Sequence, residues 1–359
     1  MQGSSRPGRR TFAAAAALAA AFFASPRPSA AAQKLGPVRE VRIDRIVRYV
    51  MRDRSIPGLS LGIARAGFPL YLRGFGVMRV GGEAPVTPQT IFAIGSLTKT
   101  FTAAATLLAL RSGALAFSSP LPDDPAADVG DALAMAAGLA DYADLPGFSA
   151  SRREPVAALA LYDAALRAPR AFAPGTRAAY SNSDYLALAL AIQHAERRPY
   201  ASFLQRAILE PLHLDATAVA WPAFAAVAST ARGNVPAGTP TLGFGTADLS
   251  SNVPDLLRWY AAFFGGRVLS DKWLAATLPP VALRHGGTSA YGDGVVAARF
   301  FGRSAWLVRG YVAGYSSIAV HLRREDLDLV ILTNADRVDL TPLARSIVAR
   351  VLDIRDPLR

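Results

Sequence analysis

Ser96 and Lys99 stand three residues apart at the start of a long apolar segment. Residues 97–113 are rich in alanine and leucine and end at Gly113, which predicts a buried helix closed by a glycine. Residues three apart on a helix share one face, so the serine hydroxyl and the lysine amine would lie within reach of each other. A hydroxyl and an amine at this spacing suggest nucleophilic catalysis.

The chemistry of this pair depends on the lysine. A serine hydroxyl is a weak nucleophile until a base takes its proton, and a lysine can be that base where burial or a nearby cation keeps it neutral. The helix N-terminus would also favour negative charge on an attacked carbonyl oxygen. A helix-capping serine beside a solvated lysine is the alternative. Lys99 has apolar neighbours and is one of three lysines, with Lys34 and Lys272, in a chain that otherwise uses arginine.

A second polar group, Tyr180 with Asn182, follows the Pro174-Gly175 turn. A tyrosine held near the lysine could pass protons, because a neighbouring cation favours its deprotonated form. An asparagine amide can bind a substrate carbonyl and orient the lysine. The alternative is a turn tyrosine packed on a helix, with Asn182 as a cap.

The elements that must position these residues follow the order strands, helices, then strands and a closing helix. Residues 58–64 and 69–77 are β-rich runs separated by Ala66-Gly67 and predict a hairpin. Further patterns predict helices at 97–113, 153–168, 183–197, 200–210, 253–264, 270–278 and 340–352, strands at 294–300, 304–309, 315–322 and 327–333, and a loop at 118–130. This order predicts a sheet built from both chain ends, with a mainly helical domain inserted between them.

Residues 58–62 also match G-x-S-x-G, the nucleophile elbow of α/β-hydrolases. That elbow needs a strand before its serine and a helix after it. Here Ser60 lies inside a run that continues as a strand to Ala64, so we expect an ordinary strand.

Composition excludes several kinds of site. The chain has no cysteine, so disulfides and thiol nucleophiles are excluded. Its four histidines lie far apart, without metal-ligand spacing. The net charge of +12 is carried by scattered arginines without a dense basic run, so we expect no nucleic-acid partner.

Residues 1–32 have the composition of a secretory signal peptide. Arginines at the start precede an apolar, alanine-rich stretch at 12–24, and small residues at 30–32 suit cleavage near Ala32. The Arg9-Arg10 pair is compatible with twin-arginine export and with a plain signal peptide. No later stretch looks transmembrane, so we expect a periplasmic or secreted protein.

The motifs together resemble the serine β-lactamase-related hydrolases: class C β-lactamases, D-alanyl-D-alanine carboxypeptidases, D-aminopeptidases and related esterases. The similarity covers roughly residues 36–355 in matching order. It is carried by Ile56-Pro57-Gly58, residues 92–103 around Ser96, Pro174-Gly175-Thr176, residues 180–183 and Leu209-Glu210-Pro211-Leu212.

This resemblance implies an α+β fold of the β-lactamase/transpeptidase type, in which helices flank an antiparallel sheet. The hydrolase domain would cover residues 36–357. Its sheet subdomain would come from about 36–95 and 240–357, and its helical subdomain from about 96–239.

The resemblance also implies an acyl-enzyme mechanism. Ser96 would be the nucleophile, Lys99 and Tyr180 would handle protons, and Asn182 would position the substrate. The backbone N–H groups of Ser96 and Val312 would hold the oxyanion. The substrate would be an ester, a D-amino-acid amide or a β-lactam, from a small molecule or a cell-wall peptide. No metal or organic cofactor is implied.

The third motif of the family departs from its usual form. Arg309 stands where relatives have lysine or histidine and, by resemblance, would bind substrate with its positive charge. Tyr311 stands where relatives have glycine and would narrow or reshape the cleft. Residues 134–139 also differ from the His-Thr-Ser-Gly-Leu of many relatives. These differences keep open the alternative of a catalytically silent binding protein, and the net positive charge keeps open that of a cell-wall binding module. Residues 285–288, His-Gly-Gly-Thr, are a rival third motif, but we expect a loop there.

Overall fold

The computed structural model describes residues 34–148, 156–220, 225–230, 233–234 and 243–354. The expected signal peptide, residues 1–32, lies outside the described residues. Among the helices of the described part, none is long and apolar enough to cross a membrane.

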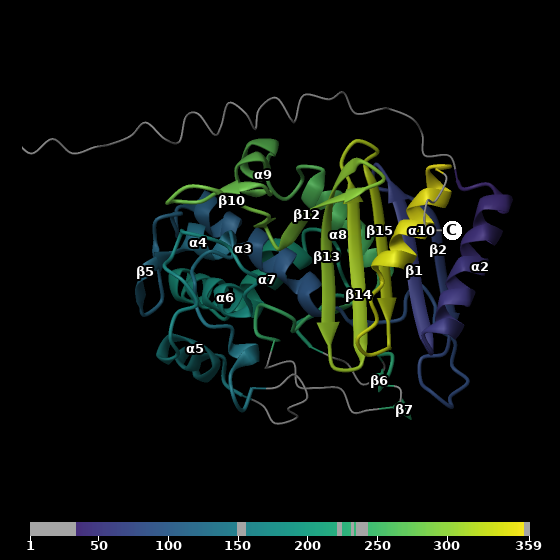
Figure 1. Cartoon of the computed structure of the whole chain (residues 1–359), viewed down its shortest axis with the longest axis horizontal. Coiled ribbons are helices and arrows are strands. Elements are labelled where there is room, and N and C mark those ends of the chain that lie inside the picture. Colours follow the sequence, from purple (N-terminus) through teal and green to yellow (C-terminus); the bar gives the residue numbers. More distant parts are fainter. Residues whose placement is uncertain (1–33, 149–155, 221–224, 231–232, 235–242, 355–359) are drawn as a thin grey trace, which may run out of the picture.

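A seven-stranded antiparallel sheet forms one side of the molecule (Figure 1), in the order β11-β12-β13-β14-β15-β1-β2. The strands are β1 (Gly58–Arg65), β2 (Phe68–Gly76), β11 (Tyr291–Gly292), β12 (Val295–Phe300), β13 (Arg303–Val312), β14 (Tyr315–Leu322) and β15 (Leu327–Thr333). The hairpin β1–β2 joins β15, with Leu59 opposite Thr333. The sheet is therefore built from both chain ends, as predicted.

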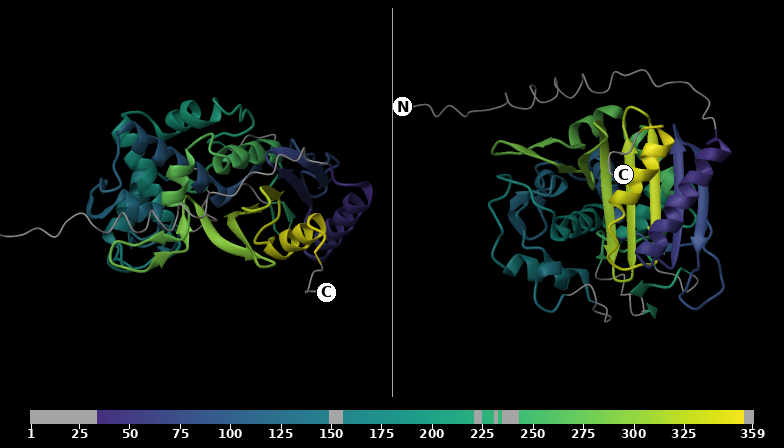
Figure 2. Two further views of the ribbon diagram at one scale, coloured as in Figure 1. Left: turned by 90° about the horizontal axis from the view of Figure 1, so that it is seen from above. Right: turned by 45° about the vertical axis from the view of Figure 1, so that its right-hand side comes forward.

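Helices cover both faces of this sheet (Figure 2). Every residue of β14 and β15 is buried, as expected for strands with both faces covered. Alternate residues of β15 face opposite ways. Ile331 joins the apolar cluster of α2 (Pro37–Asp53) and α10 (Thr341–Val351), whereas Val330 joins the cluster of α8 (Val253–Phe264) and the helical region. Neither α2 nor the strand pair β4–β5 was predicted from the sequence.

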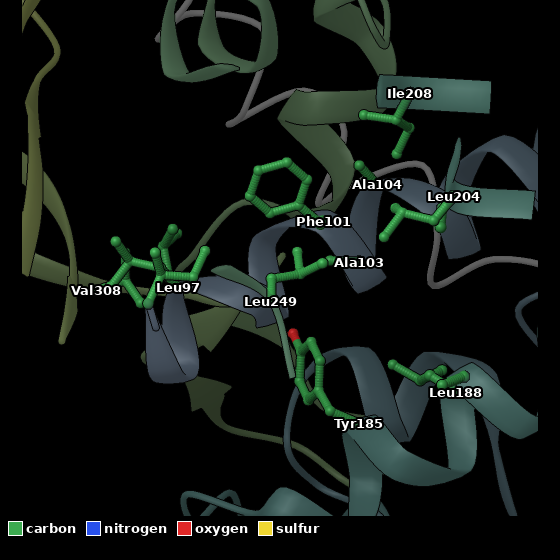
Figure 3. Packing of buried hydrophobic residues seen from close by; sticks show 14 of the residues in the cluster. Leu97, Phe101, Ala103, Ala104, Tyr185, Leu188, Leu204, Ile208, Leu249 and Val308 are labelled. Carbon is green, nitrogen blue, oxygen red and sulfur yellow. The ribbon is translucent and has the colours of Figure 1, made fainter. Parts of the chain in front are cut away.

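The helical region surrounds α3, the helix that follows Ser96. Its elements are α3 (Thr98–Ser112), α4 (Val129–Leu133), α5 (Ala158–Arg167), α6 (Asn182–Glu196), α7 (Tyr200–Leu204) and a π-helix at Gln205–Leu209. Residues 98–110 of α3 are all buried, and the helix ends at Gly113 with φ +81°. Phe101 stacks on Trp259 of α8 at 4.1 Å between ring centroids. Figure 3 shows Phe101 of the same cluster near Ala104 and Ile208. The predicted buried helix with a glycine end is confirmed.

Short strand pairs hold the remaining loops. They are β3 (Phe92–Ala93) with β8 (Ser250–Ser251), β4 (Pro120–Leu121) with β5 (Asp124–Asp128), β6 (Ser229–Thr230) with β7 (Gly233–Asn234), and β9 (Val281–Ala282) with β10 (Thr288–Ser289); α9 covers Asp271–Thr277. The stretch predicted as a loop at 118–130 thus contains strands, because Ala127 is buried and Asp124 pairs with Arg170.

Two sequence alternatives are settled by these elements. Ser60 is a buried residue inside β1 and donates to the Thr87 carbonyl at 3.3 Å, so the G-x-S-x-G match is a strand, as expected. Residues 285–288 belong to the turn and the start of β10 after β9, where Leu283 N–H donates to the Gly287 carbonyl. The rival third motif is therefore a hairpin loop.

Candidate active site

Ser96 lies in a 3₁₀ turn, Gly95–Leu97, that leads directly into α3. Gly95 has φ +56°, and a Cβ there would stand 2.5 Å from the backbone nitrogen of Tyr311. Only glycine combines this left-handed conformation with so close an approach. Ser317 of β14 holds the preceding residue, because its Oγ donates to the Ile94 carbonyl at 2.8 Å. The turn is thereby fixed against the end of β13.

The side-chain amine of Lys99 lies beside Ser96 and forms three hydrogen bonds. The lysine is 1% exposed. Its Nζ donates to Ser96 Oγ at 3.1 Å, to Asn182 Oδ1 at 2.7 Å and to the Thr246 carbonyl at 3.1 Å. Three acceptor oxygens therefore surround the amine, and its hydrogen-bonding capacity is satisfied although it is buried.

Tyr180 completes the group on the open side. Its Oη lies 2.6 Å from Ser96 Oγ, and Lys99 Nζ lies 4.9 Å from the centre of its ring. Tyr180 is 44% exposed, and its ring makes an edge contact with that of Tyr291. The Ser96 hydroxyl therefore sits between a phenol that reaches solvent and a buried amine. The structure brings together all four residues that the two motifs singled out.

Asp141 sets the orientation of Asn182 and was missed from the sequence. Asn182 begins α6, and its Nδ2 donates to Asp141 Oδ1 at 3.2 Å and Oδ2 at 3.0 Å, while its backbone N–H donates to Oδ2 at 3.0 Å. With the NH₂ group held this way, Oδ1 points to Lys99. Asp141 also caps a 3₁₀ turn by accepting from Ala143 N–H. Local sequence shows only this capping pattern, which is common in loops.

The segment at 134–139 supports the site through its backbone. The Met135 carbonyl accepts from Ala179 N–H at 3.0 Å, and the Ala136 carbonyl accepts from Gly175 N–H at 2.9 Å. Ala137 N–H donates to Asp184 Oδ2 at 3.1 Å. These bonds hold the chain that carries Tyr180. Because they use main-chain groups, the altered side chains of this segment leave that support in place.

A buried carboxyl lies beneath the lysine. Asp248 is 2% exposed, and its Oδ2 accepts from Gly245 N–H at 3.0 Å, while its Oδ1 has no partner among the described residues. Burial raises the pKa of Asp248 to about 7, and the positive charge of Lys99 opposes that rise. Asp248 thus fixes the loop whose Thr246 carbonyl accepts from Lys99.

Arg309 does not join this group, which corrects the expectation from the third motif. Successive side chains of a strand point to opposite faces. Val308 belongs to the cluster on the Ser96 side, and Figure 3 shows it beside Leu97. Ile318, the partner of Arg309 on β14, belongs to the cluster of α2 and α10. Arg309 shares that opposite face, where its charge helps to lower the pKa of Asp339.

Tyr311 also points away from Ser96. Its hydroxyl donates to Asp336 Oδ1 at 3.0 Å, and the Arg337 guanidinium lies over its ring at 5.0 Å. The expectation that this side chain narrows the cleft is therefore wrong. The glycine of the motif is Gly310, where a Cβ would stand 2.1 Å from the Ile94 carbonyl oxygen.

The N–H of Val312 is directed away from the site as well. A two-residue turn pairs Val312 directly with Tyr315 of β14. The pair flanking such a turn exchanges both backbone hydrogen bonds, and the next pair along points its N–H groups outward. The N–H of Tyr311 therefore faces the free edge of β13, since the ladder with β12 ends at Leu307. This is the edge against which Gly95 packs.

Among the described residues, no three histidine, aspartate or glutamate side chains gather in a way that could hold a metal ion. The polar groups of the site are a hydroxyl, an amine, a phenol and an amide, from Ser96, Lys99, Tyr180 and Asn182. The arrangement suits proton transfer to and from a serine hydroxyl.

Comparison with known sequences agrees with this geometry. A family model described as Beta-lactamase matches residues 43–351. A D-aminopeptidase of Gluconobacter oxydans (strain 621H) is 26% identical over 299 residues, which are 77% of this chain and 56% of that protein. A beta-lactamase of Pseudomonas fluorescens is 28% identical over 189 residues, 52% of each chain. The chain spans about half the length of these curated relatives.

Solved structures share the fold. The penicillin-binding protein homologue from Pyrococcus abyssi superposes with a TM-score of 0.77 at 22% identity, covering 88% of this chain and 78% of that one. D-amino acid amidase from Ochrobactrum anthropi SV3 superposes with a TM-score of 0.75 at 23% identity, covering 88% and 97%. These likenesses confirm the expected β-lactamase/transpeptidase-like α+β fold, whereas the subdomain boundaries stay a prediction.

Proposed function

Because the chain belongs to the Beta-lactamase family, we propose that it is a serine hydrolase that forms an acyl-enzyme on Ser96. One observation carries the proposal: Ser96 Oγ lies 2.6 Å from Tyr180 Oη and 3.1 Å from Lys99 Nζ. A hydroxyl with two proton-handling groups in hydrogen-bond contact is the arrangement that an activated nucleophile needs.

In the acylation step, Ser96 Oγ attacks the substrate carbonyl and its proton passes to the Tyr180–Lys99 pair. The oxyanion accepts hydrogen bonds from the N–H groups of Ser96 and Tyr311, the latter in place of Val312. The leaving group departs with the proton held by the pair. Water then attacks the acyl carbonyl and gives up a proton to the same pair. The pair returns that proton to Ser96 Oγ as the bond between Oγ and the acyl carbon breaks and the acid is released. Asn182 keeps Lys99 in place throughout.

The substrate side of the proposal is an amide or ester of a small amino acid with an uncharged leaving group. Among the described residues, Lys99 is the cationic side chain that hydrogen-bonds to Ser96 and Asn182, and no other cationic side chain forms a hydrogen bond with Ser96, Tyr180 or Asn182. The site face of β13 presents Val308 where a cation was expected. A leaving group with a free carboxylate would lose its hydration there without a counter-charge. The similar D-aminopeptidase suggests the D configuration.

The test is hydrolysis of D-alanine p-nitroanilide by the purified protein beside its Ser96→Ala variant. L-alanine p-nitroanilide and a D-alanyl-D-alanine peptide, which has a carboxylate leaving group, serve as comparison substrates. We expect turnover of the D-anilide, little turnover of the other two, and only background with the variant.

Intact-protein mass spectrometry after mixing with a slow ester substrate locates the acyl group. An added acyl mass on the wild type and none on Ser96→Ala would support the nucleophile. Equal activity of both proteins would refute it. Silence of both towards amides and esters, with no acyl adduct, would favour the catalytically silent binding protein.

A further inference from the structure

We infer that the outer face of α2 docks on a surface of anionic lipid headgroups. The inner side of this helix packs on the sheet through Ile43 and Val47, which are fully buried. The opposite side, called the α2 outer face below, is exposed along about four helical turns. It consists of Val38, Val41, Arg42, Arg45, Arg48, Tyr49 and Arg52.

The charge on this face is not compensated. Arg42, Arg45 and Arg52 form no ion pair within the part of the chain that the structure describes. The three acidic residues of the helix are directed elsewhere. Asp44 accepts from Tyr71 and Arg73 of β2, Asp53 pairs with Arg54 at 3.0 Å, and the half-buried Glu40 acts electrostatically on Tyr71 and Arg73. A row of free guanidinium groups is therefore presented to one side.

Apolar side chains lie between the arginines. Val38, Val41 and Tyr49 are 64%, 49% and 63% exposed. They are three of the nine large apolar side chains that are exposed in the described chain. Arginines mixed with a tyrosine and aliphatic side chains are typical of helices that rest in a membrane interface, where a tyrosine ring suits the headgroup layer. This mixture favours a lipid surface over a soluble polyanion.

The position of α2 leaves the candidate active site free. α2 lies against the β2 edge of the sheet, through the contacts of Asp44 with β2 and as Figure 1 shows. β14, β15 and β1 separate that edge from β13, which borders Ser96. A protein docked through α2 would keep Tyr180 accessible to substrate.

The experiment is co-sedimentation of the purified protein with two kinds of vesicle, phosphatidylcholine alone and phosphatidylcholine mixed with phosphatidylglycerol. We expect binding to the mixed vesicles at low salt, little binding to the neutral ones, and release at high salt. Equal binding to both kinds, or no binding to either, would overturn the inference.

Two charge-matched triple variants locate the surface. Replacing Arg42, Arg45 and Arg52 by Gln should weaken binding to the mixed vesicles by about 100-fold, from about fivefold per basic residue. The control replaces the exposed arginines 197, 206 and 267 by Gln, with the same change of net charge, and should bind like the wild type. Equal losses in the two variants would mean that net charge alone drives binding, which contradicts a docking face on α2.

Tyr49→Ser separates lipid from other polyanions. Burial of the ring in the headgroup layer predicts weaker binding at unchanged charge, and unchanged binding would contradict the assignment to lipid. Thermal unfolding followed by circular dichroism checks that each variant is folded. None of these residues belongs to the hydrolytic site, so the vesicle-binding result can be interpreted even if the serine hydrolase proposal fails.

Discussion

The buried carboxyl of Asp293 offers a quantitative test of how burial makes the stability of this protein depend on pH. It lies in the turn between β11 and β12 with φ +51°, and its side chain is fully buried. Oδ2 accepts from Thr277 Oγ1 at 2.6 Å, while Oδ1 has no partner within the described residues. Burial raises the pKa of Asp293 from 3.8 to about 7. The folded state therefore prefers the neutral acid, and the unfolded state ionises first as pH rises.

The size of the effect follows from linkage. Because the folded-state pKa is raised, the contribution of this carboxyl to stability is complete below pH 3.8 and is lost as pH rises through about 7. One pKa unit corresponds to about 1.4 kcal/mol, so the full cost at high pH is about 4 kcal/mol. Between pH 5 and pH 8 the wild type should lose roughly 2–3 kcal/mol through Asp293 alone.

The Asp293→Asn variant removes this titration and keeps an acceptor for Thr277. Asparagine also tolerates a positive φ better than most residues. Urea unfolding of both proteins at pH 5 and pH 8 gives the difference in their free energies of unfolding at each pH. Relative to the wild type, the free energy of unfolding of the variant should be roughly 2–3 kcal/mol more favourable at pH 8 than at pH 5. A difference that does not change with pH would refute the reasoning. Any fixed cost of the amide cancels in the comparison.

Three further predictions concern the site. Asn182→Leu removes the 2.7 Å acceptor of Lys99, and kcat/KM should fall about 10- to 100-fold, as for one charge-assisted hydrogen bond; unchanged kinetics would contradict its positioning role. Asp248→Asn removes a buried carboxyl whose pKa burial raises to about 7, so urea unfolding should show the variant gaining stability relative to the wild type between pH 5 and pH 8, and a difference that does not change with pH would contradict this. Gly310→Ala would place a Cβ 2.1 Å from the Ile94 carbonyl oxygen, so denaturant titration should show a loss of about 1–3 kcal/mol, and wild-type stability would disprove the contact.

Features that depend on local spacing were predicted correctly from the sequence. Ser96 and Lys99 meet because three residues span one helical turn, and this holds wherever the helix lies. The apolar run after them predicted α3, and its glycine end is a local backbone property. The hairpin β1–β2 and strands β12 to β15 followed from short β-rich runs. The resemblance to the family added the sheet arrangement and placed Tyr180 and Asn182 near the lysine.

Contacts between distant segments were not visible in the sequence. Asp141 orients Asn182 across 41 positions, and Asp248 approaches Lys99 from a loop almost 150 residues away. Each carboxyl lies in an ordinary loop context, so only the packed fold reveals its partner. The helix α2 was missed for another reason: four of its seventeen residues are exposed arginines, and the apolar pattern on the buried side is short.

The third motif is the part of the site for which the sequence was least informative and the tertiary structure most decisive. The type and place of β13 were predictable, and its residues 309–312 were correctly taken to border Ser96. Which side chain faces Ser96 depends on strand register, since a shift of one residue exchanges the two faces of the sheet. The hairpin turn at Ala313-Gly314 sets that register and places Val308 and Gly310 towards Ser96, with Arg309 on the other face. Spacing along the chain determined the nucleophile and its amine, whereas the pairing of β13 with β14 decided which groups surround them.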